Sequence, residues 1–442
     1  MTGPRDNRMR RRDVFESERP VGVVFDCHVN GLGIIRSLGE ERVPVLALDC
    51  SARAIGLRSR YCYHRVCPDP GKSQRQFIDF LMETGKSLHS KGVLFPANDK
   101  WLLAISRYRK ELEEHYVLPM SGDDVIQSCV DKIQMYARAE QADIPVPRTL
   151  FCEDMAQLPE LRSAMEYPSI IKARIPPAFD SAFRRRVFRV DDWQDVAGWL
   201  HKNRAVIKEN QLGCVIQEVI PGDAAALYTF SAYSNRKAAV VAFSVIRKLR
   251  QSPPDFGTIT VGRVERQPRV IELGTRLLER FGLYGLSNTE FKFDPRDGEF
   301  KLMEINARSG MSIYYTTRCG VNLPYFAYRE AVGEQMDVAS PQEGDYGALW
   351  VVPEFRWLTV PARRIGRRLN PDQVAGGTDY YAIDRKKETQ VINSVFQKQD
   401  PMPYLMLFLR KLTAVVVGGV RLLRGRIFGH RPKPDNREDD LN

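Results

Sequence analysis

The sequence predicts an α/β protein in which a Rossmann-like domain is followed by a second part that contains a β-hairpin and by a C-terminal helical extension. Short apolar runs alternate with helical patterns over the first 120 residues, which is typical of a doubly wound parallel sheet. Asp131-Lys132 then opens a helical pattern, which the prolines within residues 144–147 end, and these prolines indicate a boundary. Two apolar runs joined by a polar turn, at 288–293 and 300–305, predict a β-hairpin in the second part of the chain.

The first strand is expected at residues 21–26, followed by a glycine turn at 30–33 and a helix. Two interpretations of this turn stay open. In a dinucleotide fingerprint, Gly31 and Gly33 would approach a phosphate and Asp49 would bind the ribose. In the other interpretation the glycines only form a tight turn. The second is favoured, because Arg36 takes the place of the third glycine and would crowd the helix against its strand.

Composition narrows the class of protein. The chain has 442 residues, 43% of them hydrophobic, and a net charge of +11, which indicates two or three folded units and anionic partners. Nucleic acid is not expected as a partner, because no aromatic-basic motif accompanies the charge. Eight scattered cysteines favour reduced thiols in a cytoplasmic protein. Cys62, His64 and Cys67 form a weak zinc candidate that lacks a fourth ligand.

The predicted hairpin carries two glutamates and an asparagine that could hold a metal. Glu290 and Glu304 would lie on adjacent antiparallel strands, and Asn306 two residues further would share the face of Glu304. Such hard oxygen ligands suit Mg²⁺, or the similar Mn²⁺. The alternative is a pair of glutamates on a solvated face. The apolar neighbours Phe291 and Leu302 favour the metal site, because acids inside a core need a reason to be there.

A resemblance now joins these elements. The chain resembles the ATP-grasp superfamily, especially carboxylate–amine ligases of the D-aspartate ligase and carbamoyl-phosphate-synthase-like branch. The resemblance covers roughly residues 20–335 and rests on motifs in the family's order: Asp131-Lys132, Ile171-Lys172, Gln217 to Gly222, Thr289-Glu290-Phe291 and Met303 to Arg308.

The resemblance implies a domain layout and a reaction. Residues 20–120 would form a Rossmann-like pre-ATP-grasp domain. Residues 121–335 would form the ATP-grasp domain of two α+β subdomains, with its lid at about 168–220, and residues 336–403 a C-terminal extension. The activity implied is an ATP-dependent amide-forming ligase that joins a small-molecule carboxylate and an amine through an acyl phosphate, with amino acids among the candidate substrates. ATP and Mg²⁺ would be the cofactors.

It also implies roles for individual residues. Lys132 and Lys172 would contact the ATP phosphates, and Arg308 would face the transferred phosphoryl group. The backbone of the hinge residues Gln217, Glu218, Val219 and Ile220 would recognise the adenine edge, with Glu218 beside the exocyclic amine and Asp223 as the candidate for the ribose. The implied metal ligands are Glu290, Glu304 and Asn306. The basic segment 247–254, with Lys248 and Arg250, would lie near the acceptor or be a solvated loop. The 30–33 turn would hold the anionic substrate.

One segment departs from the family pattern. Residues 178–186, in the place of a glycine-rich lid loop, contain no glycine and end in three arginines. Arginines could replace backbone amides in closure. Two other functions therefore stay open: a catalytically silent ATP-binding regulator, and a nucleotide-dependent oxidoreductase that uses the Rossmann-like domain.

The two ends of the chain are predicted to differ from the body. Residues 1–19 are expected to be a disordered basic N-terminus, and 429–442 a disordered tail. Residues 404–428 predict a basic amphipathic helix, too often interrupted by arginines to span a bilayer. It would either touch an anionic membrane at its inner face or pack on the body of the protein. The sequence leaves the oligomeric state open, with a homodimer as one candidate assembly.

Overall fold

The computed structural model describes residues 8–174, 182–183, 187–210, 213–252, 256–334, 339–340, 349–352 and 391–413. The strands are β1 (Gly22–Phe25), β2 (Val45–Asp49), β3 (Tyr63–Val66), β4 (Gly92–Pro96), β5 (Tyr116–Val117), β6 (Thr149–Cys152), β7 (Ser169–Ala173), β8 (Val187–Val190), β9 (Cys214–Glu218), β10 (Leu227–Ser234), β11 (Val240–Ser252), β12 (Thr258–Val264), β13 (Gly285–Asp294), β14 (Glu299–Asn306), β15 (Leu349–Val351) and β16 (Val391–Asn393). The helices are α1 (Arg11–Phe15), α2 (Val29–Glu40), α3 (Gln74–Lys86), α4 (Asp99–Arg107), α5 (Arg109–Leu112), α6 (Asp123–Val130), α7 (Lys132–Gln141), α9 (Trp193–Asn210), α10 (Pro268–Phe281), α11 (Ile313–Arg318), α12 (Leu323–Ala331) and residues 402–413, with the 3₁₀ turns η1 (Ile55–Arg58), η2 (Met155–Ala164) and η3 (Ala224–Ala226).

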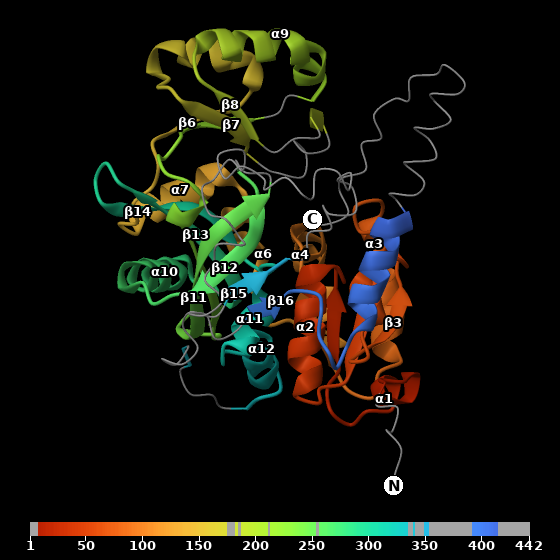
Figure 1. Ribbon diagram of the computed structural model, residues 1–442. Coiled ribbons are helices and arrows are strands. Elements are labelled where there is room, and N and C mark those ends of the chain that lie inside the picture. Colours follow the sequence, from red (N-terminus) through yellow and green to blue (C-terminus); the bar gives the residue numbers. More distant parts are fainter. Residues whose placement is uncertain are drawn as a thin grey trace, which may run out of the picture.

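The first part of the chain folds around a parallel sheet with the strand order β3-β2-β1-β4-β5. The central strand β1 is buried at every position, as expected for a strand covered by helices on both faces. Helices alternate with these strands along the chain (Figure 1). The carboxyl ends of parallel strands share one edge of a sheet, which is where ligands bind in such folds.

The second part contains two further sheets. The smaller is antiparallel with the order β6-β9-β7-β8, and α9 packs on it through Val196 and Ile207. The larger has the order β14-β13-β10-β11-β12-β15-β16. Figure 1 shows the small sheet with α9 as a separate lobe above the large one. The predicted α/β fold class is confirmed, whereas the predicted domain limits stay predictions.

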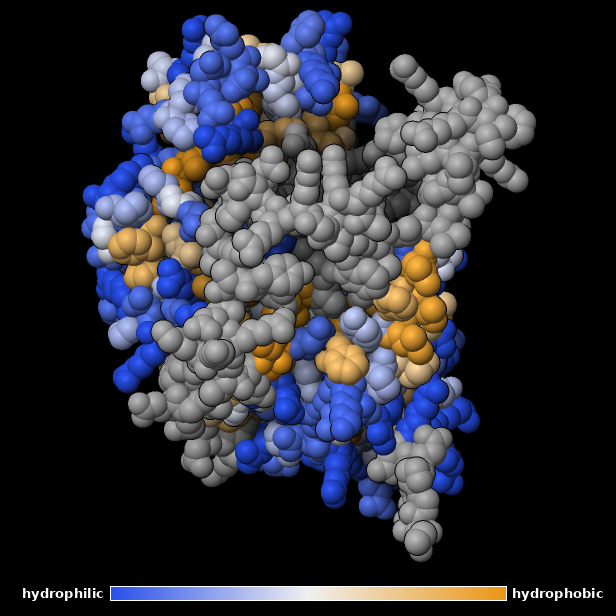
Figure 2. Space-filling model, viewed as in Figure 1, coloured by the Kyte–Doolittle hydropathy of each residue, from blue (hydrophilic) through white to orange (hydrophobic). Residues whose placement is uncertain are grey.

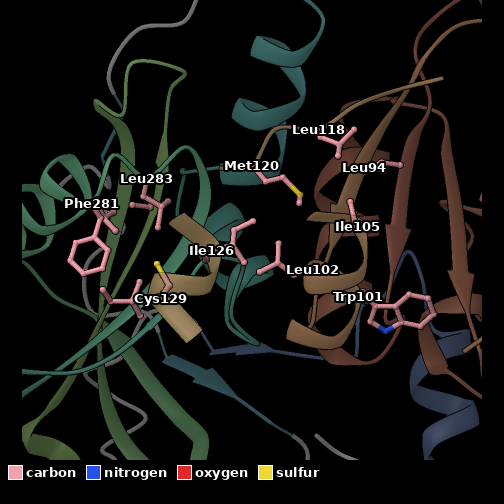
Figure 3. Packing of buried hydrophobic residues seen from close by; sticks show 14 of the residues in the cluster. Leu94, Trp101, Leu102, Ile105, Leu118, Met120, Ile126, Cys129, Phe281 and Leu283 are labelled. Carbon is pink, nitrogen blue, oxygen red and sulfur yellow. The ribbon is translucent and has the colours of Figure 1, made fainter. Parts of the chain in front are cut away.

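One hydrophobic core joins the Rossmann-like domain to the large sheet. It runs from Leu94 and Trp101 through Leu102 and Ile126 to Phe281, and Figure 3 shows these side chains spread between the Rossmann-like domain and the large sheet. Burial of apolar side chains is worth roughly 1.5–3 kcal/mol each. The first domain therefore has a fixed position beside the large sheet.

The C-terminal segment connects both parts. β16 adds to the large sheet in parallel with β15, and Asp400 then reaches the Rossmann-like domain, where it pairs with Arg36 at 3.0 Å. Both side chains of this pair are buried. Helix 402–413 follows and buries Leu407 beside Leu32 of α2 and Ile55 of η1.

The structure corrects the prediction of a disordered N-terminus for its described part, residues 8–19. Residues 11–15 form α1, whose Val14 is fully buried, and the Met9 N–H donates to the Arg60 carbonyl. An apolar side chain spaced among arginines was enough to anchor the segment. Residues 1–7 and 429–442 lie outside the described residues.

The predicted glycine turn at 30–33 is also wrong, because α2 already begins at Val29. A Cβ on Gly31 would lie 2.2 Å from the Asp26 carbonyl oxygen, and one on Gly33 would lie 2.6 Å from Ile313. Both glycines therefore permit close packing inside a helix and not a turn around a phosphate. Arg36 does not crowd β1, because its side chain leaves α2 toward Asp400.

The weak zinc candidate gains no support. The Cys62 thiol donates to the carbonyls of Gly56 and Ser59, and the described residues contain no ligand cluster that includes Cys62, His64 or Cys67. Within the same residues no helix is both long and apolar enough to cross a bilayer.

Candidate active site

The predicted metal ligands come together on the β13–β14 hairpin. Glu290 and Glu304 are direct register partners, and Asn306 lies two residues beyond Glu304 with its amide donating to the Asn288 carbonyl at 3.3 Å. The turn follows the polar chemistry expected, with Gly298 at a φ of 75° and its N–H donating to the Asp294 carbonyl. Two carboxylates and one amide oxygen thus share one strand pair.

Lys132 faces this hairpin from α7. Asp131 caps that helix by accepting from the Ile133 N–H, as the sequence predicted, and the nearly buried Lys132 reaches Glu304 at 3.0 Å. Burial alone would raise the pKa of Glu304, but the charges of Lys132, Lys172 and Arg308 outweigh it and lower this pKa to about 2. Glu304 is therefore ionised at neutral pH and able to bind a cation.

Lys172 approaches the same place from the small sheet. Its ammonium donates to the Gln217 side-chain oxygen at 2.8 Å and to the Tyr136 hydroxyl at 3.0 Å. Both partners are neutral, so burial lowers the pKa of Lys172 to about 8, an effect that the charge of Glu304 opposes. The two predicted phosphate-binding lysines thus lie on opposite lobes, and the predicted hinge residue Gln217 contacts one of them directly.

The basic segment on β11 divides between two roles. Lys248 is buried and points at Glu290, with 3.5 Å between its ammonium and the carboxylate. The Arg247 guanidinium instead donates to the Ala225 carbonyl. Arg250 lies beside a register shift in β11 and is half-buried. Lys248 therefore lies beside the acidic hairpin, and the alternative prediction of a solvated loop does not hold for this residue.

Arg308 follows the hairpin and meets a residue that the sequence did not indicate. Asp99, at the start of α4, accepts from the Arg308 Nε at 2.7 Å and from Nη2 at 2.9 Å. Burial would lower the pKa of Arg308, but the Asp99 carboxylate overrides it and raises this pKa further. The position of Asp99 just after β4, at the carboxyl edge of a parallel sheet, was the signal that could have found it.

Several side-chain and backbone groups of the predicted adenine hinge form hydrogen bonds within the protein. The Glu218 carboxylate accepts from the Arg148 N–H at 2.8 Å and from the Arg296 side chain at 2.7 Å. The Val219 N–H donates to the Pro168 carbonyl, and Lys292 donates to the Ile220 carbonyl. The sequence predicted that the hinge backbone recognises the adenine edge, with Glu218 beside the exocyclic amine. The Glu218 carboxylate, the Val219 N–H and the Ile220 carbonyl all have partners within the protein, so a base bound there would have to displace or share these contacts.

Asp223, the predicted ribose ligand, is exposed at the start of η3. One of its oxygens accepts from the Ala225 N–H at 2.9 Å, which leaves the other oxygen for a ligand. A cavity of about 350 Å³ lies beside the hinge. It is lined by Tyr136, Glu140, Val146, Pro147, Arg148, Thr149, Phe151, Glu218 and Lys301.

A second group that the sequence did not indicate lies at the carboxyl edge of the parallel sheet. Asp26, His28 and Asp49 place one potential ligand atom each within 4.8 Å of one another. Burial raises the pKa of Asp26, while His28, Arg308 and Lys100 oppose that rise. Asp49, proposed above for a ribose, accepts from the N–H groups of Cys27 and Ser51 at 2.7 Å each and so serves the sheet edge itself.

The lid is seen only in part. Of the glycine-poor segment 178–186, only residues 182 and 183 lie within the described part of the chain. Arg174, just before it, grips Asp131 with its Nη2 at 2.9 Å, and the Lys132 N–H donates to the Arg174 carbonyl at 3.1 Å. The lid strand β7 is thereby tied to the start of α7, next to both lysines.

The chain combines a Rossmann-like domain, a small antiparallel lobe and a large sheet whose hairpin carries paired glutamates. Residues 236–351 match the family model described as ATP-grasp in the biosynthetic pathway with Ter operon. The chain is homologous to D-aspartate ligase from Enterococcus faecium (strain Aus0004), with 24% identity over 392 residues, 84% of this chain and 92% of the relative. The chain thus contains an ATP-grasp domain within a longer region of homology.

Solved structures agree on the fold. An L-amino acid ligase from Bacillus licheniformis matches with a TM-score of 0.55 and 18% identity over 72% of this chain and 75% of that one. The biotin carboxylase domain of Hydrogenobacter thermophilus 2-oxoglutarate carboxylase, solved with MgADP and bicarbonate, gives 0.58 and 15% over 75% and 73%. N5-carboxyaminoimidazole synthetase from Staphylococcus aureus, solved with ADP, gives 0.56 and 13% over 74% and 80%.

Proposed function

We propose that this protein is an ATP-dependent carboxylate–amine ligase that forms an amide bond through an acyl phosphate, with an amino acid as one substrate. One observation carries the proposal. Lys132 of α7 and Lys172 of β7 meet Arg308, which follows β14, around the acidic hairpin. Lys132 and Glu304 are 172 positions apart in the sequence. Such a cluster of cations around paired carboxylates suits a polyphosphate bound with a divalent metal.

The hairpin fits Mg²⁺ or Mn²⁺ by the chemistry of its donors. Glu290 and Glu304 offer two carboxylates and Asn306 an amide oxygen, all hard ligands of the kind these ions prefer. Each glutamate now faces a lysine, Lys248 or Lys132, and both lysines lie where a nucleotide's phosphates could take over these contacts. When bound, the metal would neutralise charge on the transferred phosphoryl group.

The chain's own cations would do the remaining electrostatic work. Lys132 and Lys172 would grip the phosphates from opposite lobes, and Arg308 would stabilise the charge that develops on the phosphoryl oxygens during transfer. The carboxylate substrate would gain a phosphate leaving group, which an amine then displaces. A free carboxylate is a poor electrophile at neutral pH, so the amide bond requires this activation.

The other two functions are disfavoured by specific contacts. An oxidoreductase would need Gly31, Gly33 and Asp49 for a dinucleotide, but the glycines pack against Asp26 and Ile313 and Asp49 binds backbone amides. A silent ATP-binding regulator would not need to retain Lys132, Lys248 and Arg308 around Glu290 and Glu304.

The test is chemical trapping. Purified full-length protein with ATP, Mg²⁺ and a panel of D- and L-amino acids, D-aspartate included, should release ADP in the presence of the right acid. Hydroxylamine added in place of the amine should then yield a hydroxamate. Release of AMP and pyrophosphate with amide formation would show adenylation and refute the acyl-phosphate route. The variant Glu111→Gln alters an exposed ion pair with Arg75 and should give the same products as the wild type.

We also propose that the C-terminal helix meets an anionic membrane surface from the cytoplasmic side. Residues 402–413 expose a row of apolar side chains at helical spacing, and Figure 2 shows an apolar patch where this helix lies in Figure 1. The exposed fractions are 45% for Met402, 43% for Leu405, 45% for Leu409 and 38% for Leu412. Arg410 and Lys411 flank the row, and the sequence continues with Arg421, Arg424 and Arg426, a charge pattern that complements acidic headgroups.

Vesicle sedimentation tests this surface. The full chain should bind vesicles with acidic lipids at low salt, and Leu405→Glu with Leu409→Glu should abolish binding. Val391→Glu, at another exposed apolar site (57%), should leave it intact. If the full chain stays in the supernatant at low salt, the proposal is wrong; if the glutamates instead dissolve a dimer, a second copy covers the row.

The homodimer remains a separate proposal. The Hydrogenobacter thermophilus biotin carboxylase domain was solved as a dimer, and sedimentation velocity of this chain distinguishes a 50.6 kDa monomer from its dimer.

A further inference from the structure

The orientation of Arg308 depends on few groups, and they can be counted. A guanidinium carries five N–H donors. Nε and Nη2 donate to the two oxygens of Asp99 at 2.7 and 2.9 Å. Nη2 also donates to Asn306 at 3.1 Å, and Nη1 to the Ser309 carbonyl at 3.0 Å. One N–H, on Nη1, is left without a partner among the described residues. The guanidinium is therefore held on all sides except that of this N–H, which could donate to a ligand.

Asp99 is mounted rigidly for this task. It is the first residue of α4, where the Asn98 side chain caps the helix by accepting from the Lys100 N–H at 2.9 Å. The next residues, Trp101 and Leu102, are buried in the core shared by both domains. A carboxylate held in this way can dictate the direction of a bidentate arginine, whereas a flexible surface acid could not.

A second contact holds the chain next to Arg308. The Asn30 amide, on α2, donates to the Ser309 carbonyl at 2.8 Å and to the Ala97 carbonyl at 2.7 Å. The Ser309 hydroxyl donates back to Asn30 at 2.8 Å. Asn30 and Ser309 are 5% and 1% exposed. The Rossmann-like domain therefore grips Arg308 by its side chain and Ser309 by its backbone, through two different helices.

We propose that Asp99 is a positioning residue that aims Arg308 at the reacting phosphoryl group, with Asn30 holding the backbone behind it. This inference deepens the proposed ligase function and rests on it. It assigns the Rossmann-like domain a direct part in phosphoryl transfer, because that domain supplies both grips. Without Asp99, the guanidinium would turn toward Glu304, whose negative charge already contributes to the raised pKa of Arg308.

The kinetic test separates positioning from folding. Asp99→Asn removes the charge and one acceptor, and should lower kcat for ADP release at least roughly tenfold, while KM for ATP stays within about twofold, because Arg308 acts on transfer and not on nucleotide binding. Asp99→Glu should recover part of kcat. Glu111→Gln, which alters an exposed carboxylate paired with Arg75 in the same domain, should change neither. An unchanged kcat in folded Asp99→Asn, or an equal loss in ATP affinity, would overturn the inference.

A crystal structure of Asp99→Ala supplies a readout independent of activity. The Arg308 guanidinium should leave its place, while Ser309 stays bonded to Asn30. If the guanidinium keeps its orientation through Asn306 and the Ser309 carbonyl alone, the positioning role is wrong. Failure of the proposed function looks different: wild-type protein would then release no ADP with any acid, whatever the Arg308 position in this variant.

Discussion

Lys172 should make nucleotide binding depend on pH. Its ammonium lies between two neutral groups, Gln217 and Tyr136, and burial lowers its pKa from 10.5 to about 8 despite the nearby Glu304 carboxylate. A bound phosphate would favour the charged form and return the pKa toward its ordinary value. Between about pH 8 and the higher pKa of the complex, binding therefore requires the uptake of a proton.

The magnitude follows from linkage. Below about pH 7 the lysine of the free protein is almost fully charged, and the affinity for ATP has its full value. At about pH 9 only roughly one molecule in ten is charged, so the affinity for ATP should fall roughly tenfold, or about 1.4 kcal/mol. The nucleotide's own phosphate titrates near pH 6, below this window.

Calorimetric titration with a non-hydrolysable ATP analogue measures the effect. Titrations at about pH 9, in buffers with different heats of ionisation, should reveal close to one proton taken up per nucleotide. Lys172→Arg keeps its charge at every accessible pH and should bind with a flat profile. A constant affinity in the wild type over this range, or the same slope in Lys172→Arg, would refute the account of Lys172.

Three further changes have clear expected outcomes. Lys132→Ala should weaken ATP binding by about 1.5–3 kcal/mol, since a charge-assisted contact is lost; titration measures it, and unchanged affinity would remove Lys132 from the site. Glu304→Gln should lower turnover at least about 100-fold, beyond the loss typical of groups that merely support a metal ligand, while the analogue still binds in calorimetry; full activity with Mg²⁺ would contradict the metal assignment. Asp400→Asn should destabilise the fold by about 3–5 kcal/mol, because it leaves the buried Arg36 charge unpaired; urea unfolding measures it, the exposed Asp79→Asn is the control, and equal midpoints for the two variants would contradict it.

Local signals predicted much of this structure. The alternation of strands and helices identified the parallel sheet, and the polar turn identified the hairpin with Glu290 and Glu304 in register. The prediction that a helix begins at Asp131 is confirmed, because helix capping depends on a residue and its next few neighbours. Such features depend on short stretches of chain, which a sequence displays directly.

The errors and omissions involve distant parts of the chain. Asp99 and Arg308 are 209 positions apart, and no local pattern pairs them. Gly31 and Gly33 resembled a turn because glycine is common there, yet the close approach of Ile313 explains Gly33 only once the fold is known. Arg36 seemed too large for its place because its partner, Asp400, belongs to a segment that the sequence did not connect with α2.

The pair of Arg36 and Asp400 has a consequence for synthesis on the ribosome. The two residues are 364 positions apart, and at typical elongation rates the second emerges roughly 20–70 seconds after the first. Until nearly the whole polypeptide has been made, Arg36 therefore has no Asp400 to pair with, and its charge stays on the outside of α2. Chains that stop prematurely before residue 400 would expose this charge and the apolar surface around Leu32, and cellular quality control could distinguish them from finished molecules by that surface alone.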